Sequence, residues 1–189
     1  MAPRLNIIIG STRPGRVGPS IAAWFETHAR AHAGFEPVLV DLKDFNLPVY
    51  DEPNHPRLRQ YVHDHTRAWS ASVEAADAFV FVTPEYNYFA PPALVNALDY
   101  VLHEWGYKPA GLLSYGGASG GMRSAQMLKL LLTGLRVMPI PDNVNIANFR
   151  QFVDADGIFS PNDLLAGAAK TMLDELLRWT RSLQPMRMK

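Results

Sequence analysis

The stretch "IIIGSTRPGRVGPSIAAWF", residues 7–25, decides the fold. It runs from an apolar strand through a short loop into a helix that begins at Pro19 or Ser20. A plain turn needs only a glycine or a proline. This loop gathers glycines, hydroxyls and two guanidiniums: Gly10, Ser11, Thr12, Arg13, Gly15, Arg16, Gly18 and Ser20. Such a set beside a helix N-terminus predicts a bound anion, and a phosphate monoester fits it well.

The rest of the chain repeats the same alternation. We expect strands at residues 5–9, 35–42, 77–83 and 110–115, with a short fifth strand in 136–146 that Pro139 and Pro141 interrupt. Helices are expected from residue 19 or 20 to 34, and at about 57–76, 93–102, 122–135 and 162–183. Five strands and five helices in alternation predict one α/β domain over residues 1–189. Its parallel sheet would be doubly wound, in the flavodoxin-like order 2-1-3-4-5, with helices on both faces.

Composition excludes several classes of function. Among 189 residues, 18 basic and 18 acidic side chains give a net charge of zero, so we expect no nucleic-acid partner and no membrane partner. The opening "MAPRLNIIIG" leads straight into a strand, which favours a cytoplasmic protein. The absence of cysteine excludes a thiolate nucleophile, and with it a small tyrosine phosphatase. The expected partner is a small molecule.

Three unusual loops follow the first, third and fourth strands. In this type of sheet, those loops meet at the edge where ligands bind. The second loop, "PEYNYFAPP" at 84–92, supplies aromatic rings and main-chain N–H groups, and the third, "YGGASGG" at 115–121, lets main-chain amides approach a flat ring. The first loop lacks the lysine of a P-loop and only half meets the dinucleotide fingerprint, through Gly15 and Gly18, although Asp41 stands where a ribose ligand would.

The three motifs together resemble the NAD(P)H-dependent FMN reductase family, which includes azoreductases, chromate reductases and quinone reductases. The motifs are "GSTR" at 10–13, "PEYN" at 84–87 and "YGGASGG" at 115–121, and the likeness covers about residues 5–135. The resemblance implies a flavodoxin-like enzyme that binds FMN. Electrons would pass from NADPH or NADH to a quinone, an azo compound, free flavin or a metal oxyanion such as chromate. No catalytic side chain is implied, because the flavin N5 carries the hydride.

The resemblance also assigns residues to the cofactor. Ser11, Arg13 and Ser20 would bind the phosphate, with Arg16 and Val17 lining the same loop. The departure "VGPSIA" leaves open which hydroxyl besides Ser11 contacts it. The isoalloxazine would be bordered on one side by Pro84, Glu85, Tyr86 and Asn87, and on the other by Tyr115, Gly116, Gly117 and Ser119. Glu85 is expected to act through its main-chain amide, with its carboxylate in solvent.

Other interpretations stay open at this point. A flavodoxin-like electron carrier and a Rossmann-type NAD dehydrogenase are the alternatives. His28 and His32 stand four apart, but without a third ligand no metal is expected. The family suggests a homodimer or a dimer of dimers, with Trp69 and the aromatic residues after the third helix as contacts. We expect His103, Trp105 and Tyr107 to pack a loop or to line the acceptor site.

Overall fold

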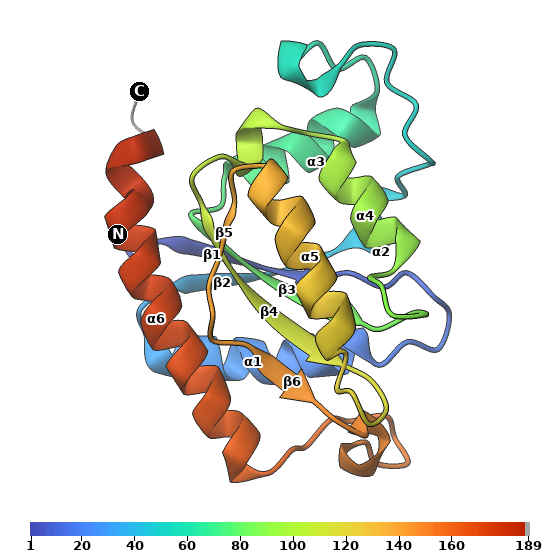
Figure 1. Cartoon of the computed structure of the whole chain (residues 1–189), viewed down its shortest axis with the longest axis vertical. Helices are drawn as coiled ribbons and strands as arrows, with labels where there is room; N and C mark the ends of the chain where they lie inside the picture. Colours follow the sequence, from blue (N-terminus) through green and yellow to red (C-terminus); the bar gives the residue numbers. More distant parts are fainter. Residues whose placement is uncertain (188–189) are drawn as a thin grey trace.

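The centre of the computed structural model, which describes residues 1–187, is one parallel sheet (Figure 1). Its strands run in the order β2-β1-β3-β4-β5, which confirms the predicted order, and β6 also pairs with β4. The strands are β1 (Arg4–Ile9), β2 (Glu36–Asp41), β3 (Ala78–Pro84), β4 (Pro109–Tyr115), β5 (Met138–Pro139) and β6 (Val144–Ile146). The central strands β3 and β4 are buried along their whole length, as their apolar runs predict.

The predicted fifth strand is two short strands. β5 pairs with Pro109 and Ala110 at the start of β4, whereas β6 pairs with 113–115 at its end. Proline has no N–H to donate to a ladder, so Pro139 and Pro141 interrupt the pairing with β4 over the residues between β5 and β6. Because β6 runs parallel to the end of β4, the chain leaves β6 at the same edge of the sheet as it leaves β1, β3 and β4.

Helices cover both faces of the sheet (Figure 1). Helices α1 (Gly18–His32) and α6 (Asp163–Arg187) pack on one face. The short helix α2 (Leu42–Phe45) packs on the other, together with α3 (Asp64–Glu74), α4 (Pro92–Asp99) and α5 (Met122–Gly134). Residues 1–187 also contain three 3-10 helices: η1 (Pro56–Leu58), η2 (His103–Trp105) and η3 (Phe149–Phe152). Apolar side chains are buried between the sheet and each of these two layers of helices. The two core clusters hold the sheet as a rigid support for the loops at its ends.

The predicted helix over 57–76 is wrong in its first seven residues, 57–63. Residues 56–58 form η1, residues 59–63 are not helical, and α3 begins only at Asp64. The N–H groups of Val62 and His63 donate to the Glu52 carboxylate at 2.9 and 3.1 Å instead of to a helix. The other predicted helices differ from the structure at their ends only: α1 runs from Gly18 to His32, α4 stops at Asp99 and α6 continues to Arg187.

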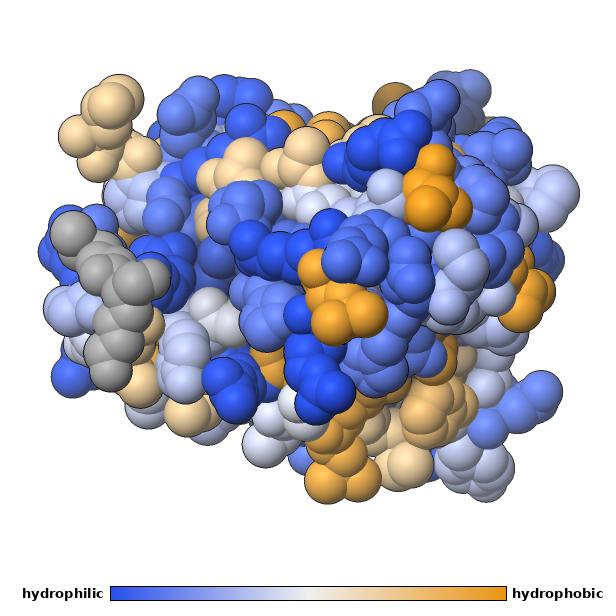
Figure 2. Space-filling view, turned by 90° about the horizontal axis from the view of Figure 1, so that it is seen from above, coloured by the Kyte–Doolittle hydropathy of each residue, from blue (hydrophilic) through white to orange (hydrophobic). Residues whose placement is uncertain are grey.

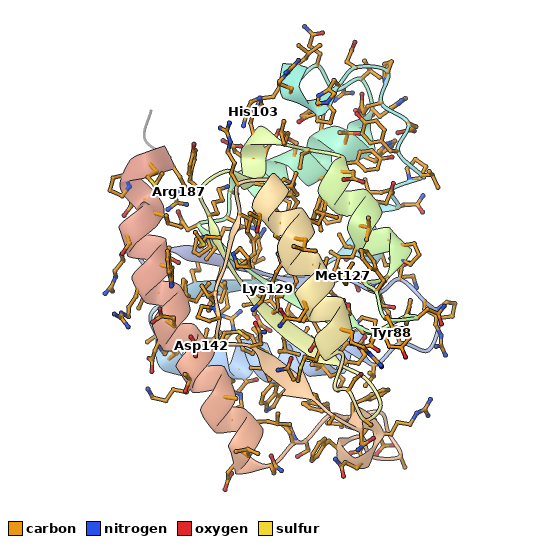
Figure 3. The ribbon with its side chains drawn as sticks, viewed as in Figure 1. Tyr88, His103, Met127, Lys129, Asp142 and Arg187 are labelled. Carbon is orange, nitrogen blue, oxygen red and sulfur yellow. The ribbon has the colours of Figure 1, made fainter. Side chains whose placement is uncertain are left out.

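Two of the aromatic residues expected at a subunit contact lie in the core, whereas Tyr107 is half-buried. Trp69 and Trp105 are buried, their rings meet edge to face at 5.8 Å, and the Trp69 indole N–H donates to the Ala97 carbonyl at 2.7 Å. The segment with His103 and Tyr107 precedes β4, so it lies at the opposite end of the sheet from the site loops (Figure 3). The expectation that these residues line an acceptor site is therefore wrong, and Trp105 packs the core.

The outer surface is mixed. On the face shown in Figure 2, hydrophobic side chains form small separate groups among hydrophilic ones. None of the helices within residues 1–187 is both long and apolar enough to cross a lipid bilayer.

Candidate functional site

The loops at the carboxyl edge of the sheet enclose a cavity of about 570 Å³, called here the main cavity. Most of the predicted site residues line it: Arg13, Arg16, Val17, Pro84, Glu85, Tyr86, Tyr115, Gly116 and Gly117. Ser11, Ser20, Asn87 and Ser119 are not among its lining residues, although Asn87 lines the groove that adjoins it. The topology therefore brings the three predicted loops to one place.

The first loop leaves β1 through a close main-chain contact. Gly10 N–H donates to the Val82 carbonyl at 2.9 Å, and a Cβ at Gly10 would come within 2.9 Å of Leu94 and 3.2 Å of that carbonyl. The loop then reaches Val17, which stands at the N-cap of α1 and offers no capping side chain. Pro19 has no N–H, and the Ser20 and Ile21 N–H groups already donate to the Val17 carbonyl at 3.0 and 3.2 Å. Within residues 1–187, the Gly18 N–H is thus the group of the first turn that is left for an acceptor outside the helix, which suits a phosphate.

The two arginines of this loop have different roles. Arg16 Nη1 donates to Asp41 Oδ1 at 2.8 Å and to the Ser11 carbonyl, and its Nη2 pairs with Asp41 Oδ2. Its guanidinium thus braces the loop against the end of β2, and is not the free phosphate clamp that the loop sequence suggests. Arg13 is exposed and has no carboxylate partner in the described part of the chain. Of these two arginines, Arg13 is the one whose charge is available to an anion.

Asp41 is committed to the same brace. Besides pairing with Arg16, its carboxylate accepts the Lys43 N–H at 2.9 Å and caps α2. A carboxylate with these partners has little left for a ribose hydroxyl, so the geometry disfavours the dinucleotide interpretation of the first loop.

The loop hydroxyls are also bound within the protein. Ser11 is 1% exposed, and its Oγ lies 2.8 Å from the Tyr86 hydroxyl, which links the first loop to the second. The Ser20 hydroxyl accepts the Phe159 N–H at 2.7 Å. Each hydroxyl therefore joins two segments of the site, whatever it contributes to a ligand.

The second loop is a tight hairpin turn. Tyr86 and Phe89 exchange main-chain hydrogen bonds of 2.8 and 3.0 Å around Asn87 and Tyr88, which both have positive φ, at 49° and 68°. Two positive φ values define the turn type that matches the twist of a hairpin, and tyrosine is strained there. Glu85 N–H continues the β3 ladder by donating to the Tyr115 carbonyl at 3.2 Å. The amides of Glu85 and Tyr86, which we expected to face the ligand, are thus paired within the protein.

The Glu85 side chain is not in solvent, contrary to the expectation. It is 8% exposed and pairs with Arg123, whose Nε donates at 2.7 Å. Ser119 Oγ donates to the other carboxylate oxygen at 3.0 Å. Burial opposes ionisation, but these hydrogen bonds and the Arg123 charge outweigh it and hold the pKa of Glu85 below its ordinary value.

The third loop is shaped by two glycines in the left-handed region. Gly120 and Gly121 have φ of 60° and 77° and carry the chain into α5. The neighbouring N–H groups of Gly117 and Ala118 have no protein acceptor within residues 1–187, and Gly117 lines the cavity. Tyr115 packs edge to face on Phe149 at 5.4 Å, and burial raises the pKa of its hydroxyl. This wall therefore combines main-chain donors with an apolar aromatic surface.

A fourth segment completes the main cavity and was not predicted. After β6 the chain returns over the site and contributes Phe149, Arg150, Val153, Asp154 and Gly157. A signal was present in the sequence, because "ANFRQF" follows the fifth predicted strand and must leave the sheet at the same edge.

A second hollow opens beside the main cavity. This side groove, of about 1100 Å³, shares Arg13, Glu85 and Tyr86 with it. Its other lining side chains are mainly apolar: Leu47, Val49, Phe89, Ala90, Pro92, Ala93 and Val95, with Asn87, Asn96 and Asp99. The site thus pairs an anion-binding, aromatic-walled cavity with an apolar neighbour, which suits a phosphorylated planar heterocycle and a second flat molecule.

Comparison with known proteins agrees with this geometry. The family model for NADPH-dependent FMN reductases matches residues 3–151. The chain is 41% identical to an NAD(P)H-dependent FMN reductase of Schizosaccharomyces pombe over 129 residues, or 67% of this chain and 64% of that protein. It is 25% identical to a 2-hydroxy-1,4-benzoquinone reductase of Burkholderia, over 96% of this chain and 98% of that one.

A solved structure has the same fold. FerB, a flavoenzyme NAD(P)H:(acceptor) oxidoreductase from Paracoccus denitrificans, superposes with a TM-score of 0.74 at 20% identity, covering 96% of this chain and 98% of the other.

Proposed function

Since the chain belongs to the NADPH-dependent FMN reductase family, we propose that it takes electrons from NADPH or NADH and passes them to quinones. When bound, FMN supplies two-electron redox chemistry between the nicotinamide and the acceptor. The observation that carries the proposal is the main cavity, where an anion-binding loop, aromatic walls and unpaired main-chain N–H groups face one space. The donor set fits FMN.

Different residues of the main cavity would bind different parts of FMN. The N-terminus of α1 and Arg13 would hold the phosphate, while Arg16 fixes the loop through Asp41. Tyr86 and the third loop would border the ring. Main-chain N–H groups such as that of Gly117 are preorganised donors for negative charge that develops on reduction.

The side groove supports quinones as the acceptor class. Its walls are mainly apolar and it opens directly beside the main cavity. A flat apolar quinone suits such walls, whereas a chromate ion would find only Arg13 as a cationic donor among the groove residues. The relative named as a benzoquinone reductase favours the same class.

The test is spectroscopic. The purified protein is mixed with FMN, freed of excess, and titrated without oxygen with NADPH or NADH. We expect the flavin band to bleach, and to return when a benzoquinone is added. Azo dye, free FMN and chromate serve as competing acceptors under the same conditions.

Two results would contradict the proposal. A bound flavin that keeps its colour with both nucleotides would support the electron-carrier alternative. Faster reoxidation by chromate or azo dye than by quinone would move the acceptor assignment to that class.

A further inference from the structure

Helix α5 begins without a cap of its own. The residue at its N-cap is Gly121, which has no side chain, and no side-chain cap is formed within the segment. A side chain there is excluded, because a Cβ on Gly121 would lie 2.7 Å from Tyr115 N and 2.8 Å from Tyr115 O. An uncapped helix start next to a buried site is costly unless another group accepts its N–H bonds.

Glu85, the residue that follows β3, supplies that acceptor. Its Oε2 accepts the main-chain N–H of Arg123, in the first turn of α5, at 3.2 Å. The same oxygen accepts Ser119 Oγ at 3.0 Å. A carboxylate at a helix N-terminus is also favoured by the helix dipole. One buried side chain thus joins the end of β3 to the third loop and to α5.

The neighbouring guanidinium of Arg123 balances the negative charge of the Glu85 carboxylate. Arg123 Nε donates to Oε1 at 2.7 Å, and Nη2 closes the ion pair. The outer face of the guanidinium lies on the Tyr88 ring, 3.9 Å from its centroid, so the same arginine supports the strained turn of the second loop. Figure 3 shows Tyr88 beside the N-terminal end of α5.

We propose that Glu85 is a positioning residue of the flavin site: from the end of β3 its carboxylate caps α5 and holds the third loop in place, and with Arg123 it forms a neutral ion pair at the cavity wall. Glu85 lines both the main cavity and the side groove, so the pair stands where the two meet. With its carboxylate ionised and bound to these partners, Glu85 has no proton to give. This inference rests on the proposed function, because its consequences are read from bound FMN.

The test compares Glu85→Gln, Arg123→Gln and the double variant with the wild type. FMN affinity is measured by quenching of flavin fluorescence, and the midpoint potential of bound FMN against a reference dye. We expect Glu85→Gln to weaken FMN binding about tenfold, because it loses hydrogen bonds to a charged acceptor. Glu85→Gln leaves a positive charge and should raise the potential, whereas Arg123→Gln leaves a negative charge and should lower it.

The double variant and one further variant separate position from charge. The double variant should return the potential close to the wild-type value while its FMN affinity stays weak. Ser119→Ala removes one contact without a change of charge, so we expect weaker FMN binding and an unchanged potential. It also serves if Glu85→Gln fails to fold.

The inference is overturned if both single variants shift the potential in the same direction. It is equally overturned if Glu85→Gln and Ser119→Ala keep wild-type affinity. Suppose that the wild type binds FMN, that NADPH or NADH reduces the bound flavin, and that the variants show the same FMN affinity and potential as the wild type. That result would refute this inference and leave the proposed function standing. A wild type that binds no FMN would refute the proposed function and this inference with it.

Discussion

Arg13 and Arg16 stand three residues apart in one loop, yet the structure gives them different tasks. Arg13 is exposed and unpaired in the described chain, so Arg13→Met should weaken FMN binding about tenfold or more and leave the stability of the apoprotein unchanged. Arg16→Met strips Asp41 of its partner, and we expect the free energy of unfolding to fall by about 1–3 kcal/mol. Flavin fluorescence and urea unfolding of the apoprotein measure the two effects.

The matched control for the arginines is the double variant Arg16→Met/Asp41→Asn, which removes both charges of the brace. It should recover part of the stability that Arg16→Met loses. A loss of FMN affinity in Arg16→Met with unchanged apoprotein stability would show that Arg16 is itself the phosphate ligand.

Lys108 gives a residue-scale prediction outside the site. It is 6% exposed, its Nζ donates to the Val73 and Glu74 carbonyls, and burial lowers its pKa to about 8. Between pH 8 and about 10, the unfolded chain keeps a proton on this lysine that the folded chain has lost. The free energy of unfolding should therefore rise with pH in this window, by at most about 1.4 kcal/mol per pH unit, relative to Lys108→Met. Urea unfolding of both proteins at matched pH values checks the sign, and equal slopes would contradict it.

At the scale of elements, the third loop requires a glycine at position 121, because a side chain does not fit there. In Gly121→Ala the new Cβ meets main-chain atoms of Tyr115 at a positive φ of 77°, so we expect a loss of about 2 kcal/mol or more and weaker FMN binding. Gly134→Ala is the control, because Gly134 is the last residue of α5 and a Cβ there would have no heavy atom within 4 Å. Equal thermal unfolding temperatures for the two variants would contradict the role given to Gly121.

Elements were predictable where local pattern decides them and not where a distant side chain does. The apolar runs of β1, β3 and β4 mark buried strands directly. The apolar spacing from Leu58 onward looks helical as far as Val62, but the Glu52 carboxylate takes the N–H groups of Val62 and His63. No periodicity reveals that competition, because it depends on a buried side chain ten residues away.

At the scale of the whole molecule, the place of the site was predictable from topology, and its internal bonds were not. Three loops at one sheet edge follow from the strand order. The partners that the side chains choose depend on packing between segments far apart in the chain, as in Arg16 with Asp41 or Glu85 with Arg123. This is why the residue types were identified while the roles of Arg16 and of the Glu85 carboxylate were not.

The predicted homodimer needs a different surface now that Trp69 and Trp105 are buried. Helix α5 offers one, since Met127 and Leu130, three residues apart on this helix, are 41% and 71% exposed. Arg123, which stacks on Tyr88, lies one turn before Met127 (Figure 3 labels Tyr88 and Met127). Methionine, tyrosine and arginine are enriched at subunit interfaces. We expect a dimer by light scattering at micromolar concentration, and a monomer for Leu130→Glu, because a carboxylate there would be buried without a partner. Leu164→Glu is the control, since Leu164 on α6 is 79% exposed and lies on another helix. A monomeric wild type, or a dimer that only Leu164→Glu disrupts, would remove α5 as the contact.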